Sequence, residues 1–332
     1  MKRRIIRQGH NTLTITLPSE WTKKLHLKAG DEVEIIEREN TLVINGHDRW
    51  DKKAYEVDIS DFTVPLIWRY MQSMYRSGCD EMTIYFDADK KGHEDAYHYY
   101  TTQFDYSKLG EKVPLKPAIA MIQEVVNRFI GIDIIETGKQ HVRIKEMAEL
   151  HPTEFDNSFR RIFITIMHLF ERMIEAIETD EIGDPALCKE LHTLDLGVDK
   201  FVDYCARILT KVSIAFPETK KQLLFSSLFI LELIGDEFKY IGKHLALTNE
   251  SVKEVAVYAK MVKDHFEKYY KLYYSFSRDL AVEFGKCDTI LYRAHFDSKD
   301  KLSGENRSIM KHLMLISKFT LALVELRIQM EY

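Results

Sequence analysis

Residues 159–177, FRRIFITIMHLFERMIEAI, set the fold class of the chain. Apolar side chains recur in this stretch every three or four residues, which is the spacing of one face of an α-helix. They are Phe159, Ile162, Phe163, Ile166, Phe170, Met173 and Ile177. The stretch therefore predicts a long helix that buries one side against a core.

The rest of the C-terminal half continues in the same way. Proline at a first helical position and a preceding or following polar cap are typical helix starts. Such signals occur at Asp184 with Pro185, at Pro217, at Thr248 or Asn249 as the cap of a fourth helix, and at Ser303 with Gly304. A further helix is expected from about Asp279. We expect two sets of three helices, over residues 149–248 and 249–332.

The first 46 residues have a different character. Thr alternates with Leu or Ile over residues 12–17, which predicts a strand with one buried face. A shorter strand through Ile5 and Ile6 is expected before it, and a short helix that begins at Pro18 and two further strands after it. Because such a unit has few large apolar side chains, we expect it to complete its core with a second copy.

Residues 48–148 are predicted to form a small α/β linker domain. Extended segments are expected over residues 55–59 and 82–86, helices over 63–75 and 116–129, and two paired strands within IDIIE and HVRIK. Residues 87–113 are interpreted as a solvated insertion with a helical turn near 93–101.

Composition limits the class of protein. The chain has 332 residues, 47 basic and 52 acidic side chains, and four cysteines without a CxxC pair. These values indicate a folded multidomain protein without a disulfide framework, which favours the cytoplasm. The opening residues lack the apolar core of a signal peptide, and the longest apolar stretch, residues 223–234, is too short to span a bilayer. We therefore do not expect the chain to be an integral membrane protein.

The N-terminus carries a concentrated positive charge. Residues 1–28 contain seven Lys or Arg and one acidic residue in a chain whose net charge is −5. Such a patch attracts phosphates and releases counterions, so DNA contact is predicted. The candidate contacts are Arg3, Arg4, Arg7, Lys23 and Lys24. The alternative is that these charges only solubilise an oligomerisation module.

The string TLTITLPSEWTKKLHLKAGDEVEI, residues 12–35, resembles the AbrB/MazE/SpoVT swapped-hairpin family. The strand that ends in Leu-Pro, the short helix with Lys23 and Lys24, and the turn at Gly30 and Asp31 carry the resemblance. It implies that two chains interlace their strands into one DNA-binding body, and it places this domain over residues 1–47.

The string LFSSLFILELIGDEF, residues 224–238, resembles the third helix of the PhoU family of phosphate-signalling regulators. The resemblance implies three-helix bundles whose acidic ExxxD motifs bind metal ions. Residues 149–248 correspond to the first repeat and residues 249–332 to a degenerate second one. The implied metal ligands are Asp195, Asp199, Glu232 and Asp236, and the implied ions are Mg²⁺, Mn²⁺, Zn²⁺ or iron.

The residues themselves leave the metal question open. Glu232 and Asp236 point nearly opposite to the core face of their helix, which is also typical of a plain solvated face with ion pairs. Phe225, Leu228 and Phe229 share that side, which favours a covered and functional face instead. Clustered carboxylates with few histidines suit hard or borderline cations.

The whole chain resembles the archaeal PhoU-like regulators. It is thus predicted to be a cytoplasmic, dimeric, non-enzymatic DNA-binding regulator of phosphate uptake, with a transporter ATPase or sensor kinase as possible protein partners. One alternative is a dimeric scaffold that docks on such a partner without binding DNA. Another is a di-metal oxidoreductase that uses His168, Glu171 and Glu175, although their His-x-x-Glu order favours a polar outer face.

Overall fold

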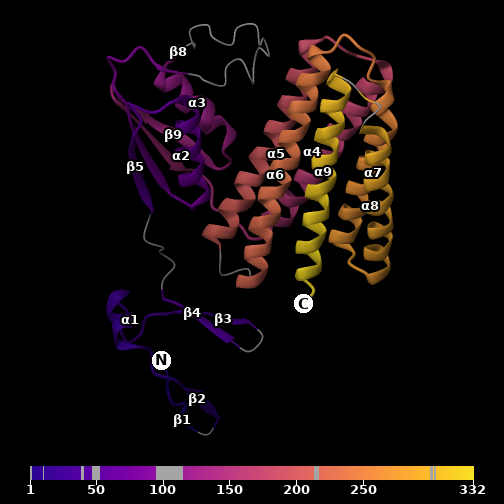
Figure 1. Ribbon diagram of the computed structural model, residues 1–332. Helices are drawn as coiled ribbons and strands as arrows, with labels where there is room; N and C mark the ends of the chain where they lie inside the picture. The colour runs from indigo at the N-terminus through magenta and orange to yellow at the C-terminus, as the bar shows by residue number, and fades with distance from the viewer. Residues whose placement is uncertain are drawn as a thin grey trace. The chain divides into compact units, whose positions relative to one another are not determined.

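The computed structural model describes residues 2–9, 11–38, 41–46, 53–94, 115–212, 217–299, 302 and 304–332. It divides into two compact units, Met1–Lys53 and Ala54–Tyr332. The fold is mainly helical, with a small N-terminal β region, as the sequence predicts (Figure 1). The finer boundaries at residues 148 and 248 stay predictions.

The N-terminal unit has the predicted order of strand, strand, helix, strand, strand. Its elements are β1 (Ile6–Gln8), β2 (Thr12–Thr14), α1 (Ser19–Lys24), β3 (Glu34–Arg38) and β4 (Thr41–Asn45). β1 pairs with β2, and β3 pairs with β4, both antiparallel. Two separate two-stranded ribbons therefore form within one chain. Part of the predicted turn between β3 and β4, residues 39 and 40, lies outside the described residues.

The larger unit begins with the expected α/β layer. Its four-stranded sheet has the order β5-β6-β10-β9, in which β5 runs parallel to β6 and the other neighbours are antiparallel. The elements are β5 (Ala54–Asp58), α2 (Val64–Arg76), β6 (Glu81–Tyr85), β7 (His93–Glu94), β8 (Leu115–Lys116), α3 (Ala118–Arg128), β9 (Ile132–Thr137) and β10 (His141–Glu146). The apolar sides of α2 and α3 share one core with the sheet. Most of the predicted turn near 93–101 lies outside the described residues.

Six helices follow in the described part of the chain and lie side by side (Figure 1). Their buried apolar side chains form one continuous core. They are α4 (Glu154–Thr179), α5 (Pro185–Lys211), α6 (Glu218–Leu247), α7 (Ala256–Tyr274), α8 (Arg278–Lys299) and α9 (Gly304–Gln329). The predicted starts of α5 and α6 are confirmed, and the Asp184 side chain caps α5 by accepting a hydrogen bond from the Ala186 amide. That the helices form PhoU-type bundles stays a prediction.

The predicted start of the fourth helix is wrong by several residues. The Thr248 hydroxyl accepts a bond from the Glu250 amide, but α7 begins only at Ala256, after a short 3₁₀ turn (Lys253–Val255). A tertiary contact explains why α7 starts later than predicted. The Asp180 carboxylate accepts a hydrogen bond of 3.0 Å from the Val252 amide and holds this segment against the end of α4.

No helix in the described ranges is long and apolar enough to cross a membrane.

Candidate functional site

The predicted DNA-contacting residues lie on the N-terminal unit and are all exposed. Arg3 and Arg4 precede β1, Arg7 lies within it, and Lys23 and Lys24 occupy the last turn of α1. None of these five side chains forms an ion pair with another described residue. Their positive charges are therefore available to an external polyanion.

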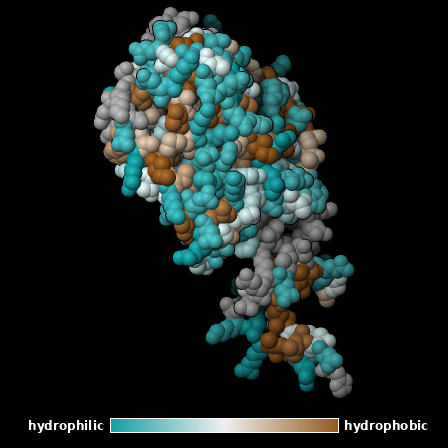
Figure 2. Space-filling model, turned by 90° about the vertical axis from the view of Figure 1, so that its right-hand side faces the viewer, coloured by the Kyte–Doolittle hydropathy of each residue, from teal (hydrophilic) through white to brown (hydrophobic). Residues whose placement is uncertain are grey.

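The same unit exposes six large apolar side chains, and its other large apolar side chains whose burial is described are half-buried. Leu13 on β2 is 66% exposed and Leu42 on β4 is 62% exposed, and Ile5, Ile6, Ile15 and Ile35 are also open to solvent. Figure 2 shows hydrophobic side chains on the surface of this unit. Gly46 is the only buried residue among those described here, and Trp21, Leu25 and Leu27 pack against it. A single copy of this unit therefore has almost no core of its own.

The predicted metal ligands lie in the larger unit, on two adjacent helices. Asp195 and Asp199 belong to α5, and Glu232 and Asp236 belong to α6. The structure brings these pairs together, because the Lys239 amine lies 2.5 Å from an Asp236 carboxylate oxygen and 3.8 Å from an Asp195 one. We call this set of four carboxylates, together with Asp203 on α5, the acidic face.

Cations of the α/β layer cover much of the acidic face. Arg76, at the end of α2, lies 2.5 Å from Asp203 and 2.8 Å from Glu232. Arg128, at the end of α3, lies 2.5 Å from Asp199. The solvated-face interpretation of Glu232 is therefore wrong, because a neighbouring layer packs over this residue. The expectation that the apolar residues beside it are covered holds for Leu228, which is buried, but not for Phe229.

Asp195 is the exception on the acidic face. Its side chain is 1% exposed, and neither carboxylate oxygen has a hydrogen-bond partner among the described residues. Gly235 makes room for it, since a Cβ atom there would lie 2.6 Å from Oδ1 of Asp195. A buried carboxylate that accepts no hydrogen bond is costly when charged. Asp195 is thus the group on this face that most needs a proton or a cation.

Proton affinities agree with this conclusion. Burial, reinforced by Asp199, raises the pKa of Asp195 well above its ordinary value. Burial also raises the pKa of Asp199 to about 7, although Arg128 opposes the shift. Burial lowers the pKa of the neighbouring His192 to about 4, with Lys239 acting in the same direction. The interior around Asp195 therefore disfavours both a charged carboxylate and a charged imidazole.

The fit of this face to a metal ion is mixed. The carboxylate of Asp195, which accepts no hydrogen bond from the described residues, and the space left by Gly235 favour a cation. Against this, no three His, Cys, Asp or Glu side chains of the described residues are arranged to hold an ion. Arg76, Arg128 and Lys239 already pair with the other candidate ligands. The metal site stays a prediction, and its ligands would have to leave these ion pairs.

The sequence interpretation missed Asp203, Arg76 and Arg128. One signal was available for Asp203, because α5 carries polar residues exactly four apart, and such residues form one stripe on a helix. The stripe comprises Asp195, Asp199, Asp203, Arg207 and Lys211. Arg207 is fully buried and donates to the carbonyls of Tyr75 and Cys79 and to Glu146. Nothing in the local sequence marks Arg76 or Arg128 as its counterparts.

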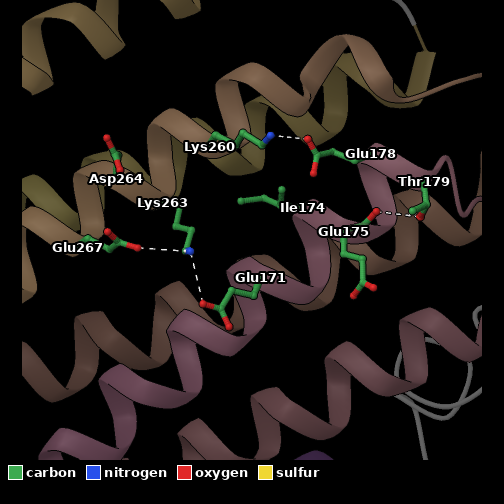
Figure 3. A pocket seen from close by; sticks show the side chains of 9 residues that line it. All are labelled: Glu171, Ile174, Glu175, Glu178, Thr179, Lys260, Lys263, Asp264 and Glu267. Atoms are coloured by element: carbon green, nitrogen blue, oxygen red, sulfur yellow. Dashed lines mark hydrogen bonds and ion pairs between the residues drawn. The ribbon is translucent and has the colours of Figure 1, made fainter.

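The residues of the oxidoreductase alternative lie elsewhere, on the outside of α4. His168, Glu171 and Glu175 are exposed, as a polar outer face requires. Glu171 and Glu175 line an open groove of about 470 Å³ between α4 and α7 (Figure 3). Lys263 crosses this groove to Glu171 at 3.4 Å. The groove shows surface ion pairs rather than inward-pointing ligands.

Comparison with known proteins identifies only the N-terminal unit. Residues 6–48 match the model of the family described as antidote-toxin recognition MazE, bacterial antitoxin. This segment is therefore a swapped-hairpin domain of the MazE/AbrB-like type, as the sequence predicted. Searches of curated proteins and of solved structures found no significant match to the chain.

Proposed function

We propose that the chain is a dimeric DNA-binding regulator whose larger unit senses a cation. The observation that carries the proposal is the combination found in the N-terminal unit. Its strands expose Ile6, Leu13, Ile35 and Leu42 in one chain, and the five candidate DNA contacts have no acidic partner among the described residues. A second copy would cover the former, and a nucleic-acid backbone would pair with the latter.

The similarity to MazE-type domains supports this proposal, since swapped-hairpin domains typically dimerise and bind DNA. The alternative is that the exposed apolar side chains bind a different protein, which would make the chain a scaffold. The two proposals differ in what the arginines do. Charges that contact DNA determine the salt dependence of duplex binding, and charges that only solubilise the unit do not.

The test is a salt titration of duplex binding, measured by fluorescence anisotropy. Replacing Arg3, Arg4 and Arg7 by Ala should weaken binding and reduce the slope of log affinity against log salt by up to about three units. The control removes three exposed lysines of the larger unit, in the variant Lys189→Ala, Lys220→Ala, Lys311→Ala, and leaves the slope unchanged. Equal slopes for the arginine variant and the wild type would favour the scaffold.

For the larger unit we propose cation binding at the acidic face, with Asp195 as its centre. The support is the buried carboxylate of Asp195, which accepts no hydrogen bond from the described residues, and the other carboxylates around it. A cation that binds only the folded state stabilises it, by about 2.7 kcal/mol at a hundredfold excess over its dissociation constant. Melting temperatures with Mg²⁺, Mn²⁺, Zn²⁺ or Fe²⁺ test this. The double variant Glu232→Gln, Asp236→Asn should lose the response.

We propose phosphate uptake as the regulated process, on the resemblance of residues 224–238 to the PhoU family alone. A direct test is whether the purified protein retards the promoter of a phosphate transporter from its own genome more strongly than an unrelated promoter of equal length. Equal retardation of both would remove phosphate uptake from the proposal and leave DNA binding in place.

A further inference from the structure

We propose that the outer face of α8 is a docking surface for a partner protein, which docks as an amphipathic helix whose apolar stripe is flanked by acidic side chains. The proposal concerns the larger unit and does not depend on the DNA or cation binding proposed above. It adds a protein partner to the regulator.

The helix α8 carries apolar side chains on two opposite faces. It packs against α7 and α9 at one edge of the helical set (Figure 1). Its inner face buries Phe284 and Leu291 in the shared core. On its outer face, residues at alternating intervals of three and four form one stripe. This outer stripe comprises Val282, Gly285, Thr289, Tyr292 and Phe296.

The outer stripe contains no charged residue over about four turns of helix. A helix that is apolar on opposite sides is normally buried on both. Tyr292 and Phe296 nevertheless remain 57% and 46% exposed in the part of the chain that the structure describes. The outer stripe therefore offers an apolar surface to another molecule.

Aromatic side chains gather at one end of this surface. Tyr292 and Phe296 lie one turn apart, and their ring centroids are 4.8 Å from each other. The helix α7 packs antiparallel to α8, and the ring contact between Tyr258 and His295 places the exposed Val257 at the same end as Phe296. Aromatic residues are enriched among those that dominate protein–protein binding. This end is therefore where we expect most of the binding energy.

Two cations border the outer stripe. Lys286 and Arg293 are both exposed and lie seven residues apart, so they project from the same side of α8. Neither side chain forms an ion pair with another described residue. Glu283, one turn before Lys286, is instead engaged by Lys268 of α7 at 2.8 Å. The two positive charges are therefore available to a partner.

The position of these charges indicates the chemistry of the partner. The exposed acids of the same side, Asp279 and Asp297, lie toward the two ends of α8, so the positive charge is confined to its middle turns. A helix docked along the outer stripe, as in a coiled coil, places its own flanking residues against Lys286 and Arg293. Acidic flanks would pair with these cations, and basic flanks would be repelled.

The same charges disfavour a second copy of α8 as the occupant. Two copies would fit best antiparallel, with Phe296 on Val282 of the other copy, because large side chains then meet small ones. That arrangement brings Lys286 of one copy close to Arg293 of the other. Like charges at the flanks of a helix pair select against that pairing. We therefore assign the surface to a different protein.

The test measures binding of two synthetic peptides to the full-length protein by fluorescence anisotropy. Each peptide consists of three heptads with Leu at positions a and d, and its e and g positions are Glu in the acidic peptide and Lys in the basic one. The like charges keep each peptide from pairing with itself. The wild type should bind the acidic peptide about tenfold or more tightly than the basic one.

Variants of α8 locate the binding. The double variant Tyr292→Ala, Phe296→Ala should weaken binding of the acidic peptide about tenfold or more, as loss of central aromatic contacts does. The double variant Lys286→Glu, Arg293→Glu keeps the apolar stripe and reverses the flanking charge. It should bind the basic peptide more tightly than the acidic one.

The matched controls change exposed residues of the same kinds elsewhere on the larger unit. They are Phe229→Ala, Leu321→Ala for the apolar variant and Lys189→Glu, Lys311→Glu for the charge variant. Both should bind the acidic peptide within about twofold of the wild type.

Three results would overturn the proposal: equal affinity of the wild type for the two peptides, binding of the acidic peptide that survives both α8 variants, or no binding of either peptide. Sedimentation velocity tests the other occupant. Loss of the dimer in Tyr292→Ala, Phe296→Ala would mean that two copies of this chain meet at α8, and would also overturn the proposal.

Discussion

The two units of the chain violate the usual distribution of side chains in opposite ways. The N-terminal unit leaves apolar side chains such as Leu13 and Leu42 in solvent. The larger unit buries charged side chains such as Arg207 and Asp195. Exposed apolar strands need a partner outside the chain, whereas buried charges need partners within it. The difference indicates the kind of interface that each unit uses. The first is expected to pack against another molecule, and the second packs its helices against its own α/β layer.

Removing Arg207 should break the larger unit most severely. Arg207→Ala leaves Glu146 and two backbone carbonyls without their donor inside the protein. Loss of one partner of a buried pair typically costs about 3–5 kcal/mol, so the free energy of unfolding should fall by about that amount. Urea denaturation followed by circular dichroism measures it. The control is Arg172→Ala, which removes a surface arginine and should lower the free energy of unfolding by about 1 kcal/mol or less. An equal loss in both variants would contradict the conclusion that the buried contacts of Arg207 stabilise this unit.

A charge on the exposed strand should break the dimer. Leu13→Asp places a carboxylate on the side of β2 that we expect a second copy to cover, which should weaken dimerisation by about 2 kcal/mol or more, as truncation of a central interface residue does. Sedimentation velocity at micromolar concentration should show a monomer with unchanged helical signal. Val282→Asp introduces the same charge at an exposed site on α8 and should leave the dimer intact. A dimer that survives Leu13→Asp would place the dimer contact elsewhere.

Neutralising Asp195 should stabilise the larger unit at alkaline pH. The folded-state pKa of Asp195 is raised, so the stability it contributes is complete below its unfolded pKa and is lost as pH rises through the folded value. Asp195→Asn avoids that loss and should raise the free energy of unfolding by about 1–2 kcal/mol at pH 8, and by almost nothing near pH 4, in metal-free buffer. A decrease at pH 8 would mean that the charged form is held by a partner.

His265 should show the opposite pH dependence and the smallest effect. It is fully buried on α7, and burial lowers its pKa to about 4. The unfolded chain therefore binds a proton that the folded chain refuses, and stability falls as pH drops below the ordinary histidine value toward 4. His265→Phe should reduce the loss between pH 7 and pH 5 by about 1 kcal/mol. Urea midpoints at the two pH values measure it, and an unchanged acid loss would exclude this residue as its source.

The local sequence was sufficient to predict most of the helices and strands. Periodic apolar residues located α4 and α5. Alternating Thr and apolar residues over 12–17 located β2, although the strand covers only Thr12–Thr14. Local signals failed at the start of α7, where Thr248 could cap a helix but Asp180 holds the next residues in another conformation. Capping preferences describe a segment in isolation, and a contact between residues 72 positions apart outweighs them.

The candidate sites divide in the same way. The basic residues Arg3 and Arg7 could be selected from composition alone, because an exposed charge patch needs no particular neighbour. The spacing of the acidic residues along their helices was sufficient to select them. It did not predict the environment in which their side chains lie. Glu232 was as compatible with a solvated face as with a covered one until α2 was placed beside it.

The sequence by itself determined the helical class of the larger unit, the order of elements in the N-terminal unit, and which carboxylates of α5 and α6 lie on one helix face. Each of these features depends on side chains a few residues apart. Only the tertiary structure decided that Arg76 and Arg128 cover the acidic face, that Arg207 is buried, and that Asp195 accepts no hydrogen bond from the described residues. The contacts of these arginines join residues 61 to 156 positions apart. Burial and pairing depend on distance in space, which no local periodicity encodes.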